Sequence, residues 1–120
     1  MSSHGNSNLD RGIALKVEGR YEEAITELRE MLVQDPNSSD GHHQLGLVYG
    51  FIGSFDESIE ELQKAVMLAP ARVDARVDLA LTFSMLGEYE KARPEFEEIL
   101  RRDPTNKRAL DNLQFFTDPV

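Results

Sequence analysis

Apolar residues recur at spacings of three and four along most of the chain, which is the spacing of one face of an α-helix. The pattern predicts an amphipathic helix from Gly5 to about Glu18 and a second from Tyr21 to Gln34. A glycine separates the two helices, and a proline follows the second. Glycine adopts the left-handed backbone that ends a helix, and proline disfavours helix in the residue before it. This part of the chain is therefore predicted to fold as a helical hairpin.

The same arrangement returns with a fixed period. Glycines and prolines recur every 34 residues, at Gly19, Gly53 and Gly87 and at Pro36, Pro70 and Pro104. A period of this length is typical of stacked helical units, each of which buries its apolar face against its neighbours. The sequence therefore predicts a single all-α domain of three hairpins, at about 5–38, 39–72 and 73–106.

Two columns of small residues indicate where paired helices approach closely. They are Gly12, Gly46 and Ala80 on the first helices and Ala24, Ser58 and Ala92 on the second helices. Larger apolar residues are predicted to fill the core around these contacts: Leu45, Leu79, Tyr49, Phe83, Tyr21, Phe55, Tyr89, Ile25, Ile59, Leu28, Leu62 and Phe96.

The helix ends carry further signals. Ser54 and Glu57 have the spacing of a capping box, so we expect Ser54 to accept the Glu57 amide. Pro94 is expected to kink the second helix of the third hairpin. A last helix, from about 106 to 116, is predicted to cap the stack with an apolar side formed by Ala109, Leu110, Leu113 and Phe116.

Composition narrows the possible functions. The chain has 120 residues, no cysteine and a net charge of −9, so disulfides and thiolate metal sites are excluded and phosphate backbones are repelled. It has no apolar run long enough to span a membrane, and its start lacks the layout of a secretion signal. We expect a cytoplasmic protein that binds neither nucleic acid nor membrane and favours basic partners.

The motif as a whole resembles the tetratricopeptide repeat family, from about Asn8 to Phe116. A small residue, Gly, an aromatic residue, Ala or Ser and Pro recur in register three times. The usual Trp or large apolar residue early in each first helix is replaced by Asn8, His42 and Arg76. The resemblance implies a right-handed α-solenoid of three helix-turn-helix hairpins plus a capping helix, in which the first helices line a concave groove.

Carried onto this sequence, the family's groove has an apolar lining and an acidic edge. The lining residues are Leu9, Ile13, Val17, His43, Leu47, Gly50, Phe51, Val77, Leu81 and Met85. The edge carries Asp10, Asp40, Asp74 and Asp78. Some lining positions could instead be buried within the stack. Gly50 is interpreted either as a notch for a partner's side chain or as drift.

The groove suggests a non-enzymatic module that binds a peptide or helix with apolar anchors and basic flanks. The alternative is a self-assembling scaffold that uses the same groove or the stack ends for homo-oligomerisation, which sedimentation over a concentration series would distinguish. A subset of the family grips chaperone tails by their C-terminal carboxylate through Lys, Asn and Arg. The matching residues here are Leu9, Ile13, Gln44, Asp74 and Asp78, so this clamp is absent.

Catalytic and metal chemistry find little support in the sequence. The histidines are His4, His42 and His43, and neighbouring helical residues diverge by about 100°, so His42 and His43 do not converge on one metal. We expect His42 to be packed or interfacial and His43 to make a polar contact in the groove. No cofactor, metal or catalytic residue is predicted.

Overall fold

The glycine turns form where the 34-residue period predicts them. In the computed structural model, which describes residues 4–114, Gly19, Gly53 and Gly87 have φ values of 80°, 83° and 78°. At the middle turn Gly53 N donates to the Gly50 carbonyl at 3.2 Å and Ser54 N donates to the Tyr49 carbonyl at 2.9 Å. The other two turns have the same pair of bonds. Each turn therefore satisfies two carbonyls of the helix it ends, with a backbone that only glycine adopts without strain.

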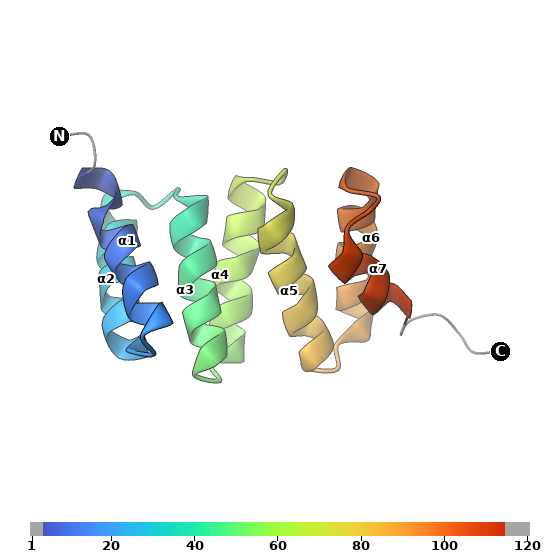
Figure 1. Ribbon diagram of the computed structural model, residues 1–120, viewed down its shortest axis with the longest axis horizontal. Coiled ribbons are helices and arrows are strands. Elements are labelled where there is room, and N and C mark those ends of the chain that lie inside the picture. Colours follow the sequence, from blue (N-terminus) through green and yellow to red (C-terminus); the bar gives the residue numbers. More distant parts are fainter. Residues whose placement is uncertain (1–3, 115–120) are drawn as a thin grey trace. The chain divides into compact units, whose positions relative to one another are not determined.

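Within residues 4–114 the backbone forms seven α-helices and no strand (Figure 1). They are α1 (His4–Val17), α2 (Tyr21–Gln34), α3 (Ser39–Phe51), α4 (Phe55–Leu68), α5 (Val73–Met85), α6 (Tyr89–Arg102) and α7 (Lys107–Leu113). The glycine turns join α1 to α2, α3 to α4 and α5 to α6, which confirms the all-α prediction of three hairpins and a last helix. Phe116, assigned to that last helix from the sequence, lies outside the described residues.

The proline column ends the second helix of each hairpin. The residues before the prolines, Asp35, Ala69 and Asp103, have φ between −138° and −142° and ψ between 76° and 82°. These values lie outside the helical region, as expected for a residue that precedes proline. Helix α6 continues through Pro94, and the kink expected there stays a prediction.

The side-chain hydrogen bond predicted for the capping box of α4 does not form. Ser54 precedes α4 but makes no side-chain cap hydrogen bond. Ser38 Oγ does accept the Gly41 amide at 3.0 Å, and Asn106 Oδ1 accepts the Ala109 amide at 3.0 Å. The glycine turn holds Ser54 at ψ 72°, whereas the two residues that cap have ψ of 107° and 111°. The backbone of the turn therefore prevents the bond that the sequence motif predicts.

The chain divides into two compact units, Met1–Ala69 and Pro70–Val120. The first unit contains α1 to α4, and the second contains α5 to α7. The sequence predicted a single domain. In a repeat protein each hairpin contacts only its neighbours in sequence, so contacts do not spread evenly over the whole chain.

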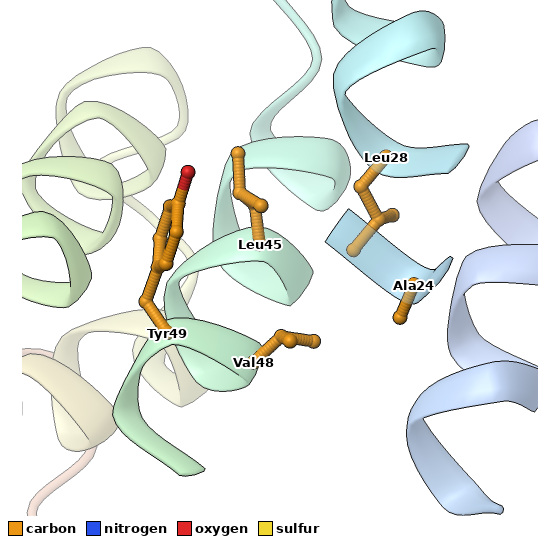
Figure 2. Close-up of a cluster of buried hydrophobic side chains, with 5 residues drawn as sticks. All are labelled: Ala24, Leu28, Leu45, Val48 and Tyr49. Atoms are coloured by element: carbon orange, nitrogen blue, oxygen red, sulfur yellow. The ribbon is translucent and has the colours of Figure 1, made fainter. Parts of the chain in front are cut away.

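The core of the first unit lies between α2 and α3. Its buried side chains are Ala24, Leu28, Leu45, Val48 and Tyr49, and Figure 2 shows the last three on α3 beside the first two on α2. The small column explains how closely the helices pack. A Cβ at Gly12 would lie 2.7 Å from Leu28 Cγ, and one at Gly46 would lie 2.8 Å from Leu62 Cγ. A side chain at either glycine would therefore push the hairpin apart.

In the second unit all but one of the residues predicted to form the core are buried. Leu79, Ala80, Phe83, Ala92 and Phe96 are buried, whereas Tyr89 is 55% exposed. Its counterpart in the first hairpin, Tyr21, is covered by the ring of Phe51 from the next hairpin. In the described part of the chain no further hairpin follows α6. Helix α7 packs on α6 and buries Ala109, with Leu113 half-buried and Leu110 exposed.

Candidate binding surface

An apolar strip lies on α1 and α3 of the first unit. Its members are Leu9, Ile13 and Val17 on α1 and Leu47 and Phe51 on α3. On each helix they are four residues apart and so share one face. Val17 is 78% exposed and Phe51 is 59% exposed, and the other three are half-buried. Lys16 Nζ donates to Gln44 Oε1 at 2.6 Å, which ties the two helices together beside the strip.

Phe51 is supported although it is exposed. Its ring lies against that of Tyr21, with centroids 5.6 Å apart and planes tilted by 33°. Aromatic pairs in this range attract each other beyond the area they bury. The contact joins the last residue of α3 to the first residue of α2. The aromatic side chain of the strip is therefore held in place by Tyr21.

Three residues that were predicted to line the groove do not contribute to its exposed apolar surface. His43 and Val77 are buried. A Cβ built on Gly50 would point at Ser58 Oγ of α4, 3.4 Å away, so the predicted notch does not open on the apolar strip. Residues of α3 such as His43 are buried because this helix packs against α1, α2 and α4, which cover most of its circumference. Only a narrow face, with Leu47 and Phe51, is left on the surface.

The second unit contributes Leu81, which is half-buried, and Met85, which is 63% exposed, both on α5. Its two predicted edge acids already contact arginines. Asp74 Oδ2 lies 3.0 Å from Arg72 Nη2, and Asp78 Oδ1 lies 3.8 Å from Arg108 Nη2. The acidic edge predicted from the sequence is therefore partly neutralised within the chain. Asp40 lies in the first turn of α3 and is exposed.

Charge differs between the two units. Residues 1–69 hold 5 Lys/Arg against 12 Asp/Glu, a net of −7. Residues 70–120 hold 8 against 10, a net of −2. The apolar strip therefore belongs to the strongly acidic unit, which attracts basic segments over a distance of about one Debye length.

A hollow of about 400 Å³ lies between α1 and α2. Arg11, Ala14, Leu15, Glu18, Arg20, Glu23, Thr26 and Glu27 line it. Arg20 contacts Glu23 at 2.6 Å and Glu18 at 3.4 Å, and Arg11 contacts Glu27 at 3.2 Å. The charged side chains that line the hollow are therefore already paired with one another. They offer few charged groups that could recognise a ligand.

The structure also reveals a repeated feature that the sequence analysis missed, which we call the polar clasps. In each hairpin a polar residue on the first helix contacts a glutamate 19 residues later on the second. Asn8 Nδ2 donates to Glu27 Oε1 at 2.7 Å, His42 Nδ1 lies 2.6 Å from Glu61 Oε1, and Arg76 Nη1 donates to Glu95 Oε1 at 2.8 Å. A signal existed, because Glu27, Glu61 and Glu95 share the 34-residue period with the three residues that depart from the family pattern.

The histidine prediction is confirmed for His42, which is buried and packed. His43 is buried, so the groove contact predicted for it is wrong. Among the side chains that the structure describes, those of residues 8–114, no group of three or more His, Asp or Glu residues could hold a metal ion. No helix in that range is both long enough and apolar enough to cross a membrane.

Comparison with known proteins agrees with this architecture. The sequence model of the family described as Tetratricopeptide repeat matches residues 53–114. No curated protein matches the chain.

Solved structures that resemble the chain include MamA, with 27% identity and a TM-score of 0.83, covering 90% of this chain and 63% of that one. The second tetratricopeptide repeat domain of human RPAP3, solved with the HSP70 peptide SGPTIEEVD, has 26% identity and a TM-score of 0.83 and covers 91% of each chain. The protein YrrB, described as having an unusual peptide-binding site, has 19% identity and a TM-score of 0.83, covering 92% of this chain and 57% of that one. This last likeness concerns the fold alone.

Proposed function

Because the chain belongs to the tetratricopeptide repeat family, we propose that it is a non-enzymatic protein-interaction module. Its apolar strip binds a peptide or a helix of a partner protein. Several similar structures are described with a bound peptide, as in the RPAP3 domains. Grooves lined by helices commonly receive an amphipathic helix or an extended segment in this way.

The observation that carries the proposal is the exposure of Phe51 on a fixed support. An aromatic side chain that is 59% exposed offers a large apolar area, and its contact with Tyr21 limits the conformations that binding must select. Val17 adds area on α1, and Leu9, Ile13 and Leu47 give the strip its base. In the second unit, Leu81 and Met85 on α5 are the proposed anchors.

The charge of the chain indicates the chemistry of the partner. The net −7 of residues 1–69 favours a segment with apolar anchors and basic flanks. Basic side chains would approach Asp40, Asp74 and Asp78, and at the last two they would compete with Arg72 and Arg108. The positions that hold a carboxylate in chaperone-binding relatives are Leu9, Ile13, Gln44, Asp74 and Asp78 here. We therefore propose that acidic C-terminal peptides are not its ligands.

A selection from a random displayed peptide library, followed by calorimetric titration, tests the proposal. Peptides that bind the purified chain should be basic and apolar, and Phe51→Ala should weaken them by about 2 kcal/mol or more, which is about thirtyfold in affinity. Met67→Ala is the matched control, since Met67 on α4 is also highly exposed but lies outside the strip.

Two results would contradict this function. Selected peptides that bind Phe51→Ala fully but lose affinity for Met67→Ala would place the contact on the second helices. Saturable binding of the acidic peptide SGPTIEEVD, which accompanies the human RPAP3 domain, would contradict the proposed charge preference. Sedimentation without peptide, over a concentration series, separates partner binding from self-assembly, because only the latter enlarges the particle.

A further inference from the structure

Phe51 lies at the end of the apolar strip, where α3 ends and charged residues begin. It is the last residue of α3, and it is 59% exposed although its ring rests against that of Tyr21. The matching positions of the other hairpins hold Val17 and Met85, so an aromatic residue occurs here only in the middle hairpin. An exposed ring offers a partner a negatively polarised π-face as well as apolar area. The charges around the ring indicate which of the two a partner uses.

The end of α3 is negatively polarised and has no basic residue to offset it. A helix carries a partial negative charge at its C-terminus, and the last turn of α3 contains no Lys or Arg. The last turn of α1 does contain a base, Lys16, but its ammonium donates to Gln44. A cation placed over Phe51 would lie at the last turn of α3, where the attraction of the helix end is strongest.

The turn that carries Tyr21 adds ionised carboxylates beside the ring pair. Residues 18–23 hold one arginine and three glutamates, a net charge of −2. Arg20 lies 2.6 Å from Glu23 and 3.4 Å from Glu18, so its charge is shared within the turn. Glu18 and Glu22 are exposed. This excess of carboxylates attracts a cation to the place where Phe51 meets Tyr21.

Elsewhere the chain itself supplies cations to its aromatic rings. Arg29 Cζ lies 5.7 Å from the centroid of the Tyr49 ring, and Lys91 Nζ lies 5.9 Å from that of Phe83. Among the side chains of residues 8–114, no Lys or Arg has such a position over Phe51. A cation that uses the π-face of Phe51 therefore comes from a partner.

We propose that the Phe51–Tyr21 pair receives an arginine side chain of the partner, whose guanidinium lies over the exposed side of the Phe51 ring. This inference rests on the proposed function and names the basic group that the partner places at this end of the strip. Arginine is favoured over lysine because its guanidinium is planar, stacks on aromatic faces and is less strongly hydrated. Its apolar stem packs on the strip while its charged end reaches the carboxylates and the end of α3.

Citrulline provides the test, because it has nearly the shape of arginine without the charge. Peptides selected on the wild-type chain should contain arginine, and each arginine is replaced in turn by citrulline. Part of any loss of affinity comes from the net charge of the first unit. The same peptides are therefore titrated against Phe51→Leu, which keeps apolar area but removes the π-face. At one arginine, the loss should be about two- to fivefold larger for the wild type than for Phe51→Leu.

Tyr89→Leu is the matched control, since Tyr89 is an aromatic residue on α6 with a similar exposure of 55%. It should show the same losses as the wild type. Equal losses for the wild type and Phe51→Leu at every arginine would overturn the inference, and so would selected peptides without arginine. In either case a weaker affinity of Phe51→Ala would leave the proposed function standing. A selection that yields no binding peptide would overturn both.

Proton NMR of the bound peptide gives a second measurement that needs no variant. A guanidinium over an aromatic ring brings the δ-methylene of that arginine into the shielding region of the ring. With one arginine isotopically labelled at a time, the δ protons of one arginine should move upfield on binding to the wild-type chain. A complex in which no arginine shows this shift would overturn the inference, even if Phe51→Leu fails to fold.

Discussion

At the scale of single residues, two glycines of α3 differ in what surrounds them. A Cβ on Gly46 would lie 2.8 Å from Leu62 Cγ and 3.2 Å from the Leu62 backbone nitrogen, whereas one on Gly50 would meet only Ser58 Oγ at 3.4 Å. We expect Gly46→Ala to lower the free energy of unfolding by about 1–3 kcal/mol through overpacking. Gly50→Ala should raise it by about 0.5–1 kcal/mol, because alanine is the better helix former.

Urea unfolding of both variants measures these changes. Opposite signs support the packing of α3 against α4. A loss of stability in Gly50→Ala as large as that in Gly46→Ala would mean that the two helices are closer at Gly50 than the structure has them.

Glu98 gives a second prediction at the residue scale. Hydrogen bonds from Arg101 and Arg102 lower the pKa of Glu98 from 4.5 to about 2. A carboxyl group whose pKa is lower in the folded state contributes stability above its unfolded pKa and loses it as pH falls. Glu98→Gln should therefore lose less stability than the wild type between pH 4.5 and about 2.

Thermal melts at descending pH test this expectation. Glu97→Gln, a change at the exposed neighbouring position, should keep the pH dependence of the wild type. Identical profiles for Glu98→Gln and Glu97→Gln would show that the two arginines do not hold Glu98 in solution.

At the scale of elements, α6 is the helix with an internal proline. Pro94 is exposed and has no N–H to donate to the Glu90 carbonyl, whereas the matching positions in α2 and α4 are Thr26 and Glu60. Pro94→Ala should restore that bond and raise the free energy of unfolding by about 1–3 kcal/mol. Pro104→Ala removes a proline outside the helices, so it should instead lower stability, by less than about 1 kcal/mol.

Chemical unfolding of the two variants separates these effects. Both lose the stiffness that proline gives the unfolded chain, so a difference in sign isolates the helical hydrogen bond. A Pro94→Ala variant no more stable than the wild type would mean that neighbouring groups already satisfy the Glu90 carbonyl.

The elements were the most predictable part of this protein. Gly19 and Pro36 act through backbone constraints that depend on few neighbours, so α2 has the bounds that the sequence predicts. Ser54 shows the limit of such reasoning, because its capping bond requires a ψ that the preceding glycine turn does not allow. Local motifs are reliable when no second motif controls the same dihedral angles.

The candidate site was less predictable. Periodicity assigns a residue to a helix face, but it does not say how many neighbours cover that face. His43 and Val77 are buried for this reason, while Phe51 and Met85 are exposed as expected. The polar clasps were missed because each pairing joins two helices, and only their packing brings position 42 beside position 61.

At the scale of the whole molecule, the net charge of −9 is the dominant long-range term. Exposed ion pairs such as Arg20–Glu23 contribute little each, so repulsion among the excess acids outweighs them. Raising salt from about 10 mM to about 150 mM shortens the Debye length from about 30 Å to about 8 Å. We therefore expect the melting temperature to rise with salt over this range.

Melting curves in sodium chloride measure this effect, with the uncharged osmolyte sucrose as a control for preferential exclusion. A melting temperature that falls with added salt would show that the ion pairs, rather than the excess negative charge, dominate the electrostatics of the folded chain.

The polar clasps have a consequence for how such arrays change by recombination. Each clasp closes within one repeat, as do the glycine turn and the proline that ends the second helix. A duplicated segment of 34 residues therefore carries its own closure and needs no matching donor in the hairpin beside it. The residues that contact the three glutamates are an asparagine, a histidine and an arginine, so the same closure is made by different side chains.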